Sequence, residues 1–413
     1  MSADYDDSGW SEVNQYAQLV RNRNFVGTLW LRQHIQIDKA HAGRAARLLL
    51  GTLYDSDVTY LNGRQIGSTG YQYPPRRYDI PEGLLREGDN VITVRFINKN
   101  GLPHFIPQKP YLLAFGDDRF SQNPMPPDVI PLSEQWRLHM GTEMPRCPGG
   151  DVSLQNQPTT LYNAVLHPLA PYALSGVVWY QGESNTGNPA PYADFLTKLM
   201  GCWRDRWQRP ELPFVIVQLA NYDGRQQTGN PSPITPQTSP VYSGWAQLRE
   251  AQRTVANNDH HAELACIIDL GETVDIHPLR KKEAAERIGL CFDRLVFGAK
   301  APLSPEPLSA SYSPADGMLT VTFDQPLRAG SVIGFEVAGA DGRFVNIGSP
   351  HASAPADGTS GNDEAVAKGT KVTMKSPISS PVKVRYAWKD NPLSANLYGQ
   401  NGLPAVPFEQ PCR

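Results

Sequence analysis

The sequence predicts a multidomain protein of the α/β and β classes, with a parallel-sheet α/β domain between two β-sandwiches. Three observations support this prediction. Short β-prone runs separated by turn residues fill residues 24–116 and return after residue 303. Between residues 161 and 302, short apolar runs alternate with segments of helical periodicity, which is typical of βαβ units. The 413 residues, 40% of them hydrophobic, suffice for two or three ordinary cores.

Residues 24–116, after a short N-terminal segment 1–23, are predicted to form an all-β sandwich of the jelly-roll type. Residues 48–53, 58–61 and 91–96 are the candidate strands, and Asn62-Gly63 is a hairpin-turn dipeptide. Four aromatic residues of this domain are candidates for stacking on sugars, although core or rim positions suit them equally: Trp30, Tyr60, Tyr71 and Tyr73.

Residues 117–160 are rich in proline and weakly periodic, so we expect a connector. The α/β domain, 161–302, has candidate strands at 177–179, 214–217 and 266–268. One helical face carries Trp245, Leu248, Ala251 and Val255, and a second carries Ala284, Ile288, Cys291, Phe292 and Leu295. Residues 303–413 predict a small β-sandwich, with strands at 319–323 and 382–388.

Polar residues follow two of the candidate parallel strands where each strand ends. Gln181 is the first polar residue after strand 177–179, and Asp275 and His277 follow the apolar run that ends near residue 270. Ligands of open parallel sheets bind beyond the carboxyl ends of the strands, so the sequence predicts a site here. His277 is the best general base because imidazole titrates near neutrality.

These segments resemble the sialate O-acetylesterase family, a branch of the SGNH-type serine esterases. The resemblance runs from about Ser8 to the end of the chain. The motifs that carry it include Trp179-Tyr180-Gln181-Gly182-Glu183-Ser184-Asn185, Trp245-Ala246-Gln247-Leu248-Arg249-Glu250-Ala251-Gln252, Asp275-Ile276-His277-Pro278 and Asn396-Leu397-Tyr398. It implies a partial SGNH-type α/β domain, preceded by a β domain similar to the sugar-binding one of such esterases. The implied reaction is hydrolysis of acetyl esters on sugars.

The resemblance also implies roles for individual residues. His277 is expected to act as base, and Asp275 to orient it, although Asp269 and Glu272 are rivals for that role. Gln181 is expected to donate to the oxyanion through its side-chain amide.

Four further residues are expected to support the reaction. Gly182 offers a backbone N–H, Asn185 supports the same loop, and Glu183 buttresses the site. A buried Glu183 would need a partner such as Arg249, which we also expect to contact substrate.

The serine nucleophile of the family lies in a Gly-Gln-Ser-Asn segment on the first strand, and the 413 residues contain no such segment. We therefore expect that the chain lacks this strand. Ser184 is a possible substitute, although helix capping is the commoner use of such a serine. Two alternatives to an active esterase follow. The chain is then either a carbohydrate-binding protein without a nucleophile, or half of a split esterase whose serine comes from an upstream chain.

Charge and composition exclude several classes of function. A net charge of -3 provides no positive excess for nucleic acid or anionic lipid, and the apolar runs are too short to span a membrane. The five cysteines lack metal-ligand spacing, so we expect no metal and no cofactor. The sequence shows no signal peptide, while the resemblance suggests a periplasmic or secreted protein. The expected partner is an O-acetylated saccharide.

Overall fold

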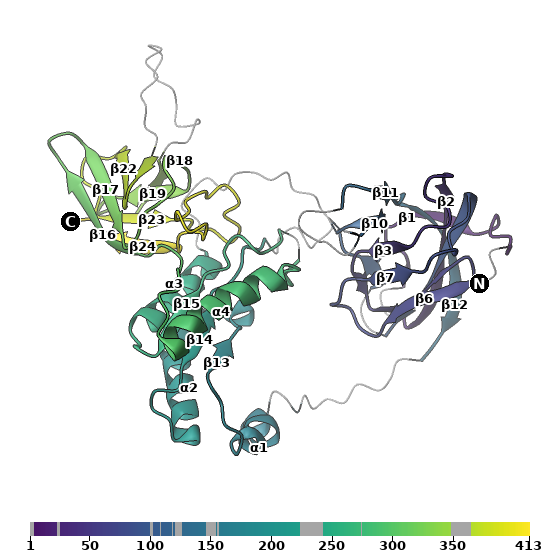
Figure 1. Cartoon of the computed structure of the whole chain (residues 1–413), viewed down its shortest axis with the longest axis horizontal. Coiled ribbons are helices and arrows are strands. Elements are labelled where there is room, and N and C mark those ends of the chain that lie inside the picture. The colour runs from purple at the N-terminus through teal and green to yellow at the C-terminus, as the bar shows by residue number, and fades with distance from the viewer. Residues whose placement is uncertain are drawn as a thin grey trace, which may run out of the picture. The chain divides into compact units, whose positions relative to one another are not determined.

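The computed structural model describes residues 4–22, 25–99, 102–107, 109–117, 119, 126–145, 154, 157–223, 243–273, 275–347 and 365–413. The protein is multidomain and rich in strands, as predicted, and forms two compact units, residues 1–154 and 155–413 (Figure 1). In the part of the chain that the structure describes, no helix has the length and apolar character needed to cross a bilayer.

Unit 1 is built from antiparallel strands in two main sheets. The first sheet has, in spatial order, β1 (Ser11–Asn14), β12 (Gln135–Glu143), β2 (Gly27–Ile37), β8 (Gly88–Asn98), β5 (Ser56–Leu61) and β6 (Arg64–Thr69). The second has β11 (Val129–Pro131), β10 (Tyr111–Phe115), β3 (Ala46–Leu50) and β7 (Arg77–Ile80). A two-stranded ribbon pairs β4 (Leu53–Tyr54) with β9 (His104–Phe105). One hydrophobic core draws residues from both main sheets.

The predicted Asn62-Gly63 turn is confirmed, because it joins β5 to β6 with Leu61 opposite Arg64. Both residues have positive φ, 50° and 83°, as the turns that suit the twist of a hairpin require.

The predicted strand 48–53 is divided into β3 and β4 at Gly51. Gly51 has a φ of +53°, and a Cβ there would lie 2.3 Å from the Tyr111 ring. The ladder therefore breaks at this residue.

The predicted connector 117–160 contains β11 and β12, which join the sheets of unit 1. In β12, Trp136 and Leu138 are buried while His139 on the opposite face is exposed. This alternation of period two was masked by the surrounding prolines.

Unit 2 begins with a turn of π-helix (Tyr162–Leu166) and α1 (His167–Leu169), followed by a parallel sheet. The order of its strands is β13 (Val177–Trp179), β14 (Phe214–Val217) and β15 (Ala262–Ala265). The connecting helices are α2 (Tyr192–Trp207), α3 (Gly244–Asn257) and α4 (Lys281–Phe297). The strands are thus linked by helices, as the alternation in the sequence predicts.

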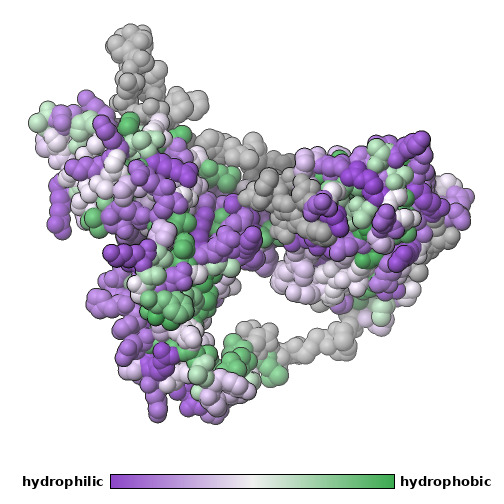
Figure 2. All heavy atoms as spheres, in the orientation of Figure 1, coloured by the Kyte–Doolittle hydropathy of each residue, from purple (hydrophilic) through white to green (hydrophobic). Residues whose placement is uncertain are grey.

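The helices cover opposite faces of this sheet. Phe214 and Ile216 share a core with α2 and α3, whereas Val215 and Val217 pack with residues of α4. Val178 of β13 lies on the α4 face, where it is 44% exposed. The described residues leave one edge of β13 unpaired. Figure 2 shows hydrophobic residues gathered over the part of unit 2 where Figure 1 places β13 and β14.

Two expectations about this region need correction. The third strand ends at Ala265, before the predicted 266–268, because its partner β14 ends at Val217. The Cys266 carbonyl accepts a hydrogen bond from Arg287 Nη1 instead of extending the ladder. The sequence analysis also did not identify α2, which buries Leu196 and Met200.

The C-terminal part of unit 2 is a sandwich of two antiparallel sheets around one core, as predicted. One sheet has the order β16 (Pro307–Ser313), β17 (Met318–Phe323), β22 (Lys371–Lys375), β21 (Ala365–Lys368) and β18 (Gly330–Val332). The other has β20 (Phe344–Asn346), β19 (Phe335–Ala338), β23 (Lys383–Tyr386) and β24 (Phe408–Pro411).

Candidate functional site

The chain leaves β13 through a backbone position that only glycine accommodates. Gly182 has a φ of +153°, and a Cβ there would lie 2.6 Å from Leu248 Cδ2 and 3.2 Å from Gln252 Nε2. The loop therefore passes directly against α3 before the short 3-10 helix Glu183–Asn185 begins.

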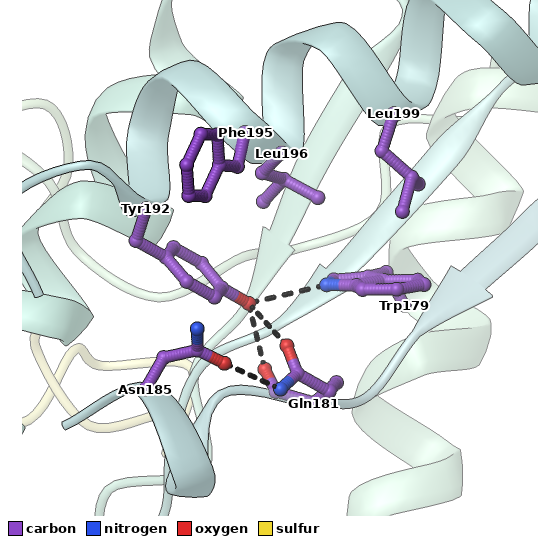
Figure 3. A pocket seen from close by; sticks show the side chains of 7 residues that line it. All are labelled: Trp179, Gln181, Asn185, Tyr192, Phe195, Leu196 and Leu199. Atoms are coloured by element: carbon purple, nitrogen blue, oxygen red, sulfur yellow. Dashed lines mark hydrogen bonds between the residues drawn. The ribbon is translucent and has the colours of Figure 1, made fainter. Parts of the chain in front are cut away.

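Three side chains bond to Gln181, and Figure 3 shows two of them, Tyr192 and Asn185. The main-chain carbonyl of Gln181 accepts from the Tyr192 hydroxyl at 2.9 Å and from Gln252 Nε2 at 3.0 Å. Its side-chain Oε1 lies 3.1 Å from the same hydroxyl, and its Nε2 donates to Asn185 Oδ1 at 2.8 Å. Trp179 Nε1 donates to the Tyr192 hydroxyl at 3.1 Å. The amide of Gln181 is thus oriented by its partners.

Gln181 and Asn185 face a small cavity of about 100 Å³. Its lining is Trp179, Gln181, Asn185, Tyr192, Phe195, Leu196 and Leu199. The volume corresponds to roughly three water molecules, so only a small group fits. Burial raises the pKa of Tyr192. The phenol therefore stays protonated at neutral pH and remains a donor.

Asp275 and His277 form a hydrogen-bonded pair after β15. Asp275 Oδ1 accepts from the His277 backbone N–H at 2.8 Å and lies 3.2 Å from its Nδ1. The carboxylate side chain is 9% exposed and the imidazole 46% exposed. The pair therefore presents an accessible imidazole held from behind by a nearly buried acid.

The loop that leads to this pair is anchored by two asparagines from distant parts of the chain. Asn221 Oδ1 accepts from the Gly271 N–H at 2.8 Å, and Asn221 Nδ2 donates to Asn391 Oδ1 at 2.8 Å. Asn391 Nδ2 donates in turn to Thr273 Oγ1 at 3.1 Å. The position of His277 thus depends on the strand exit of β14 and on the C-terminal region together.

The two rival acids have other partners. Asp269 forms a two-point ion pair with Arg287, at 2.5 and 3.0 Å. Glu272 Oε1 accepts from the Leu279 N–H at 3.0 Å. The geometry therefore favours Asp275 as the group that orients His277.

Lys281 interacts with residues that follow both β13 and β15. Its Nζ lies 4.5 Å from the centre of the Tyr180 ring and 3.2 Å from the Tyr180 hydroxyl. Burial lowers the pKa of Lys281, while the negative charges of Glu183, Asp275 and Glu272 oppose that shift. The acidic residues of both loops therefore act on one ammonium group.

Arg249 has a different place from the one predicted. Its guanidinium is fully buried and donates to four backbone carbonyls, those of Leu219, Ala220, Lys389 and Asp390, at 2.7 to 2.9 Å. Because Arg249 is fully buried, it does not face a substrate, and among the described residues it forms no ion pair with Glu183. Burial lowers the pKa of Arg249 to about 9, so it remains charged at neutral pH.

Ser184 is exposed on the short 3-10 helix and neither caps a helix nor has a hydrogen-bond partner among the residues described. It is therefore not bonded to His277.

The sequence analysis missed the roles of three residues at the site, Tyr192, Gln252 and Lys281. A signal existed for Gln252, which is a polar residue on the apolar face of α3 between Leu248 and Val255. Neither Tyr192 nor Lys281 is distinguished by the sequence pattern.

Comparison with known proteins gives a consistent result. The family described as "Carbohydrate esterase, sialic acid-specific acetylesterase" matches residues 145–274. The sialate O-acetylesterase of Mus musculus is 25% identical over 379 residues, which cover 86% of this chain and 63% of the mouse protein. The sialate O-acetylesterase of Homo sapiens is 40% identical over 63 residues, 15% of this chain and 12% of the human one.

A solved structure is also similar. The crystal structure of a carbohydrate acetylesterase from Xanthomonas citri aligns with a TM-score of 0.52 at 32% identity, over 62% of this chain and 54% of that chain. The chain thus spans less than two thirds of the length of these relatives. The family profile, the curated relatives and the structural neighbour agree, and the chain is similar to sialate O-acetylesterases and to a carbohydrate acetylesterase of known structure.

Proposed function

We propose that this chain forms part of the active site of a carbohydrate O-acetylesterase, with His277 as general base. The observation that carries the proposal is the contact between the nearly buried Asp275 carboxylate and Nδ1 of the accessible His277 imidazole. An imidazole that donates its Nδ1–H to a carboxylate keeps its basic lone pair on Nε2. That nitrogen then accepts the proton of an attacking hydroxyl.

The proposed reaction is acyl transfer in two stages. A serine hydroxyl attacks the acetyl carbonyl while His277 takes its proton, and the sugar hydroxyl leaves with that proton. Water then releases acetate from the acetyl-enzyme with the same base. Gln181 Nε2 has two N–H groups, and the one not bonded to Asn185 is available for the oxyanion. The Gly182 N–H is the second proposed donor.

The serine is proposed to lie on a strand outside the 413 residues that pairs with β13, as in a split esterase completed by an upstream chain. Two features of the described residues favour this. One edge of β13 is unpaired, and Val178 is 44% exposed on a face of the sheet that parallel sheets normally cover. An added strand would pair with that edge.

The test is release of acetate from 4-nitrophenyl acetate by the chain, alone and together with a polypeptide that carries the family's Gly-Gln-Ser-Asn segment. We expect turnover only with both polypeptides, lost in His277→Ala. His167→Ala is the matched control, because His167 also precedes a proline but lies on α1, where its Nδ1 is 2.7 Å from Arg206 Nη2. Undiminished turnover in His277→Ala would overturn the base assignment.

Turnover by the chain alone, abolished by Ser184→Ala, would instead identify Ser184 as the nucleophile. The sugar is tested by comparing acetate release from O-acetylated sialic acid with release from acetylated xylan. If both polypeptides together release no acetate but bind saccharide, the chain is a carbohydrate-binding protein.

A further inference from the structure

The side-chain amide of Gln181 has an oxygen that accepts and a nitrogen that donates, and only the nitrogen can donate to an oxyanion. Half a turn about the last side-chain bond exchanges the two atoms with little change in shape. The proposed reaction therefore requires neighbours that accept one orientation of the amide and reject the other. Groups whose donor character cannot change are able to make this selection.

Trp179 supplies the first group of fixed character. An indole N–H donates and does not accept. Its Nε1 lies 3.1 Å from the Tyr192 hydroxyl, so the Tyr192 oxygen is the acceptor of this bond (Figure 3). The hydroxyl proton of Tyr192 is then directed at Gln181, whose main-chain oxygen lies at 2.9 Å and whose Oε1 lies at 3.1 Å.

A backbone N–H supplies the second group of fixed character. The Leu219 N–H donates to Gln252 Oε1 at 3.0 Å, which fixes the orientation of the Gln252 amide. The nitrogen of that amide donates to the main-chain carbonyls of Gln181, at 3.0 Å, and Val217, at 3.3 Å. The main chain of Gln181 is therefore held by α3, and its side chain is the part that Tyr192 controls.

The Tyr192 oxygen is already occupied by donors. Burial raises the pKa of Tyr192, and hydrogen bonds from the Trp179 and Gln252 side chains oppose that shift. The oxygen thus faces two N–H groups, and its lone pairs accommodate no more. Gln181 Nε2 in place of Oε1 would be a further donor without an acceptor, whereas Oε1 accepts the hydroxyl proton. Tyr192 therefore selects the orientation with Oε1 toward its hydroxyl.

The position of the amide nitrogen follows from this orientation. With Oε1 at Tyr192, Nε2 lies toward Asn185 and donates to its Oδ1 at 2.8 Å. The amide nitrogen carries a second N–H, and Gln181 and Asn185 both line the cavity of about 100 Å³ beside the loop. The side of the amide away from Tyr192 is thus a donor.

We propose that Tyr192 is a positioning residue for the esterase reaction, because its hydroxyl selects the orientation in which Gln181 donates to the oxyanion. The catalytic part of this inference rests on the proposed function, whereas the selection of the amide orientation does not. Removal of the hydroxyl also takes away the acceptor of the Trp179 N–H. The test therefore separates positioning from a general loss of stability.

The orientation is tested first in the chain by itself, which requires no turnover. In a nitrogen–proton correlation NMR spectrum, the side-chain resonances of Gln181 are assigned by their absence in Gln181→Ala. We expect the proton bonded to Asn185 to exchange with water about tenfold faster in Tyr192→Phe than in the unaltered chain, because the amide is then free to turn. Unchanged exchange in Tyr192→Phe would overturn the inference.

Tyr386→Phe is the matched control. Tyr386 is 2% exposed and its hydroxyl accepts from the Leu397 N–H at 2.8 Å, so this variant also loses a buried hydroxyl of unit 2. It should lower Tm without changing the exchange of the Gln181 amide, and circular dichroism should show that both variants are folded. Equally faster exchange in Tyr386→Phe would assign the effect to stability and overturn the inference.

The catalytic part is tested with 4-nitrophenyl acetate and both polypeptides, the chain and the one that carries the Gly-Gln-Ser-Asn segment. Tyr192→Phe should lower kcat about tenfold and leave KM within about twofold, a smaller loss than the roughly 10²- to 10³-fold cost of removing an oxyanion donor. In a Gln181→Ala background, Tyr192→Phe should cause no further loss.

The outcomes for the two parts are distinguishable. Losses of kcat that multiply in the double variant would overturn positioning through Gln181. Absence of turnover by the unaltered pair of polypeptides would overturn the catalytic part together with the proposed function. The exchange of the Gln181 amide would then still show whether Tyr192 selects its orientation.

Discussion

The carboxylate of Asp275 does two things with one oxygen. Oδ1 accepts from the backbone N–H of His277 and contacts Nδ1 of the same residue, which is two positions further along the chain. The first bond shapes the turn, and in the proposed mechanism the second holds the ring with its Nδ1 proton toward the carboxylate. The separation of two residues is therefore sufficient for an acid to orient its histidine.

Asp275→Asn should lower the kcat of the completed esterase by about 10³- to 10⁴-fold, because the amide no longer holds the productive tautomer. Asp269→Asn is the comparison variant. It breaks the ion pair with Arg287 and should lower Tm more than kcat. Steady-state kinetics and thermal unfolding of both variants separate the roles. A larger kcat loss in Asp269→Asn would assign the orienting acid to Asp269.

Gly182→Ala should destabilise unit 2 by about 2 kcal/mol or more, because the φ of +153° is unfavourable for alanine and the new Cβ would crowd Leu248. Gly187→Ala serves as control, since it lies five residues away with no atom within 4 Å of the added Cβ. Urea unfolding measures both. Equal unfolding free energies for the two variants would contradict the close approach.

At this scale the sequence predicts which polar residues follow a strand, but not which groups they contact. Gln181 and His277 are polar residues at strand exits, and that position alone indicates them. Arg249 was assigned to substrate because a charged residue in a motif suggests function, yet its partners are main-chain carbonyls. Carbonyl positions depend on the tertiary fold, which the pattern of side chains does not encode.

Helix α3 illustrates how one element serves several purposes. Leu248 and Val255 pack on the sheet, and Gln252 supports the loop of Gln181. Glu250 and Arg253 form a cluster with Glu306, which precedes β16. The helix therefore connects the loop of Gln181 with the C-terminal sandwich.

The stability of unit 2 should fall as pH rises from about 4.5 to 7. Burial raises the pKa of Glu250 to about 7 from 4.5. In that window the folded state binds more protons than the unfolded state, so raising the pH favours unfolding. The expected change is about 1–3 kcal/mol. Glu250→Gln should reduce this slope, as measured by urea unfolding at pH 5 and pH 7.5. An unchanged slope would assign the titration to another group.

Elements were predictable where their periodicity was uninterrupted. The apolar faces of α3 and α4 and the buried run of β14 were found in the sequence, because burial repeats along them at the expected spacing. The limits of β15 were not predictable from the sequence, because this strand ends where its partner β14 ends. The period of two in β12 extends over few residues between proline-rich segments, so composition concealed it.

At the scale of unit 2, the α/β part and the C-terminal sandwich are one structure. Val406 of the C-terminal region packs in the core formed by β14 and α3. Arg249 joins the carbonyls after β14 to those of Lys389 and Asp390 after β23. Removal of either part would therefore leave buried polar groups without partners.

Arg249→Met should lower the unfolding free energy of unit 2 by about 3 kcal/mol or more, because four carbonyl groups lose their donor. Arg294→Met is the control, since Arg294 is 46% exposed and forms a surface ion pair with Glu263. Calorimetry should show one shared transition for the α/β part and the sandwich. Two separated transitions in the unaltered chain would contradict this coupling.

The hydrogen bonds between Asn221, Asn391 and Thr273 have a consequence for synthesis of the protein. A ribosome delivers residue 391 more than one hundred residues after residue 277, and domains emerge and fold from the N-terminal end. The histidine is thus translated early but gains its final support late. A nascent chain stalled before residue 391 has the complete reactive sequence of this loop without the asparagine that anchors it.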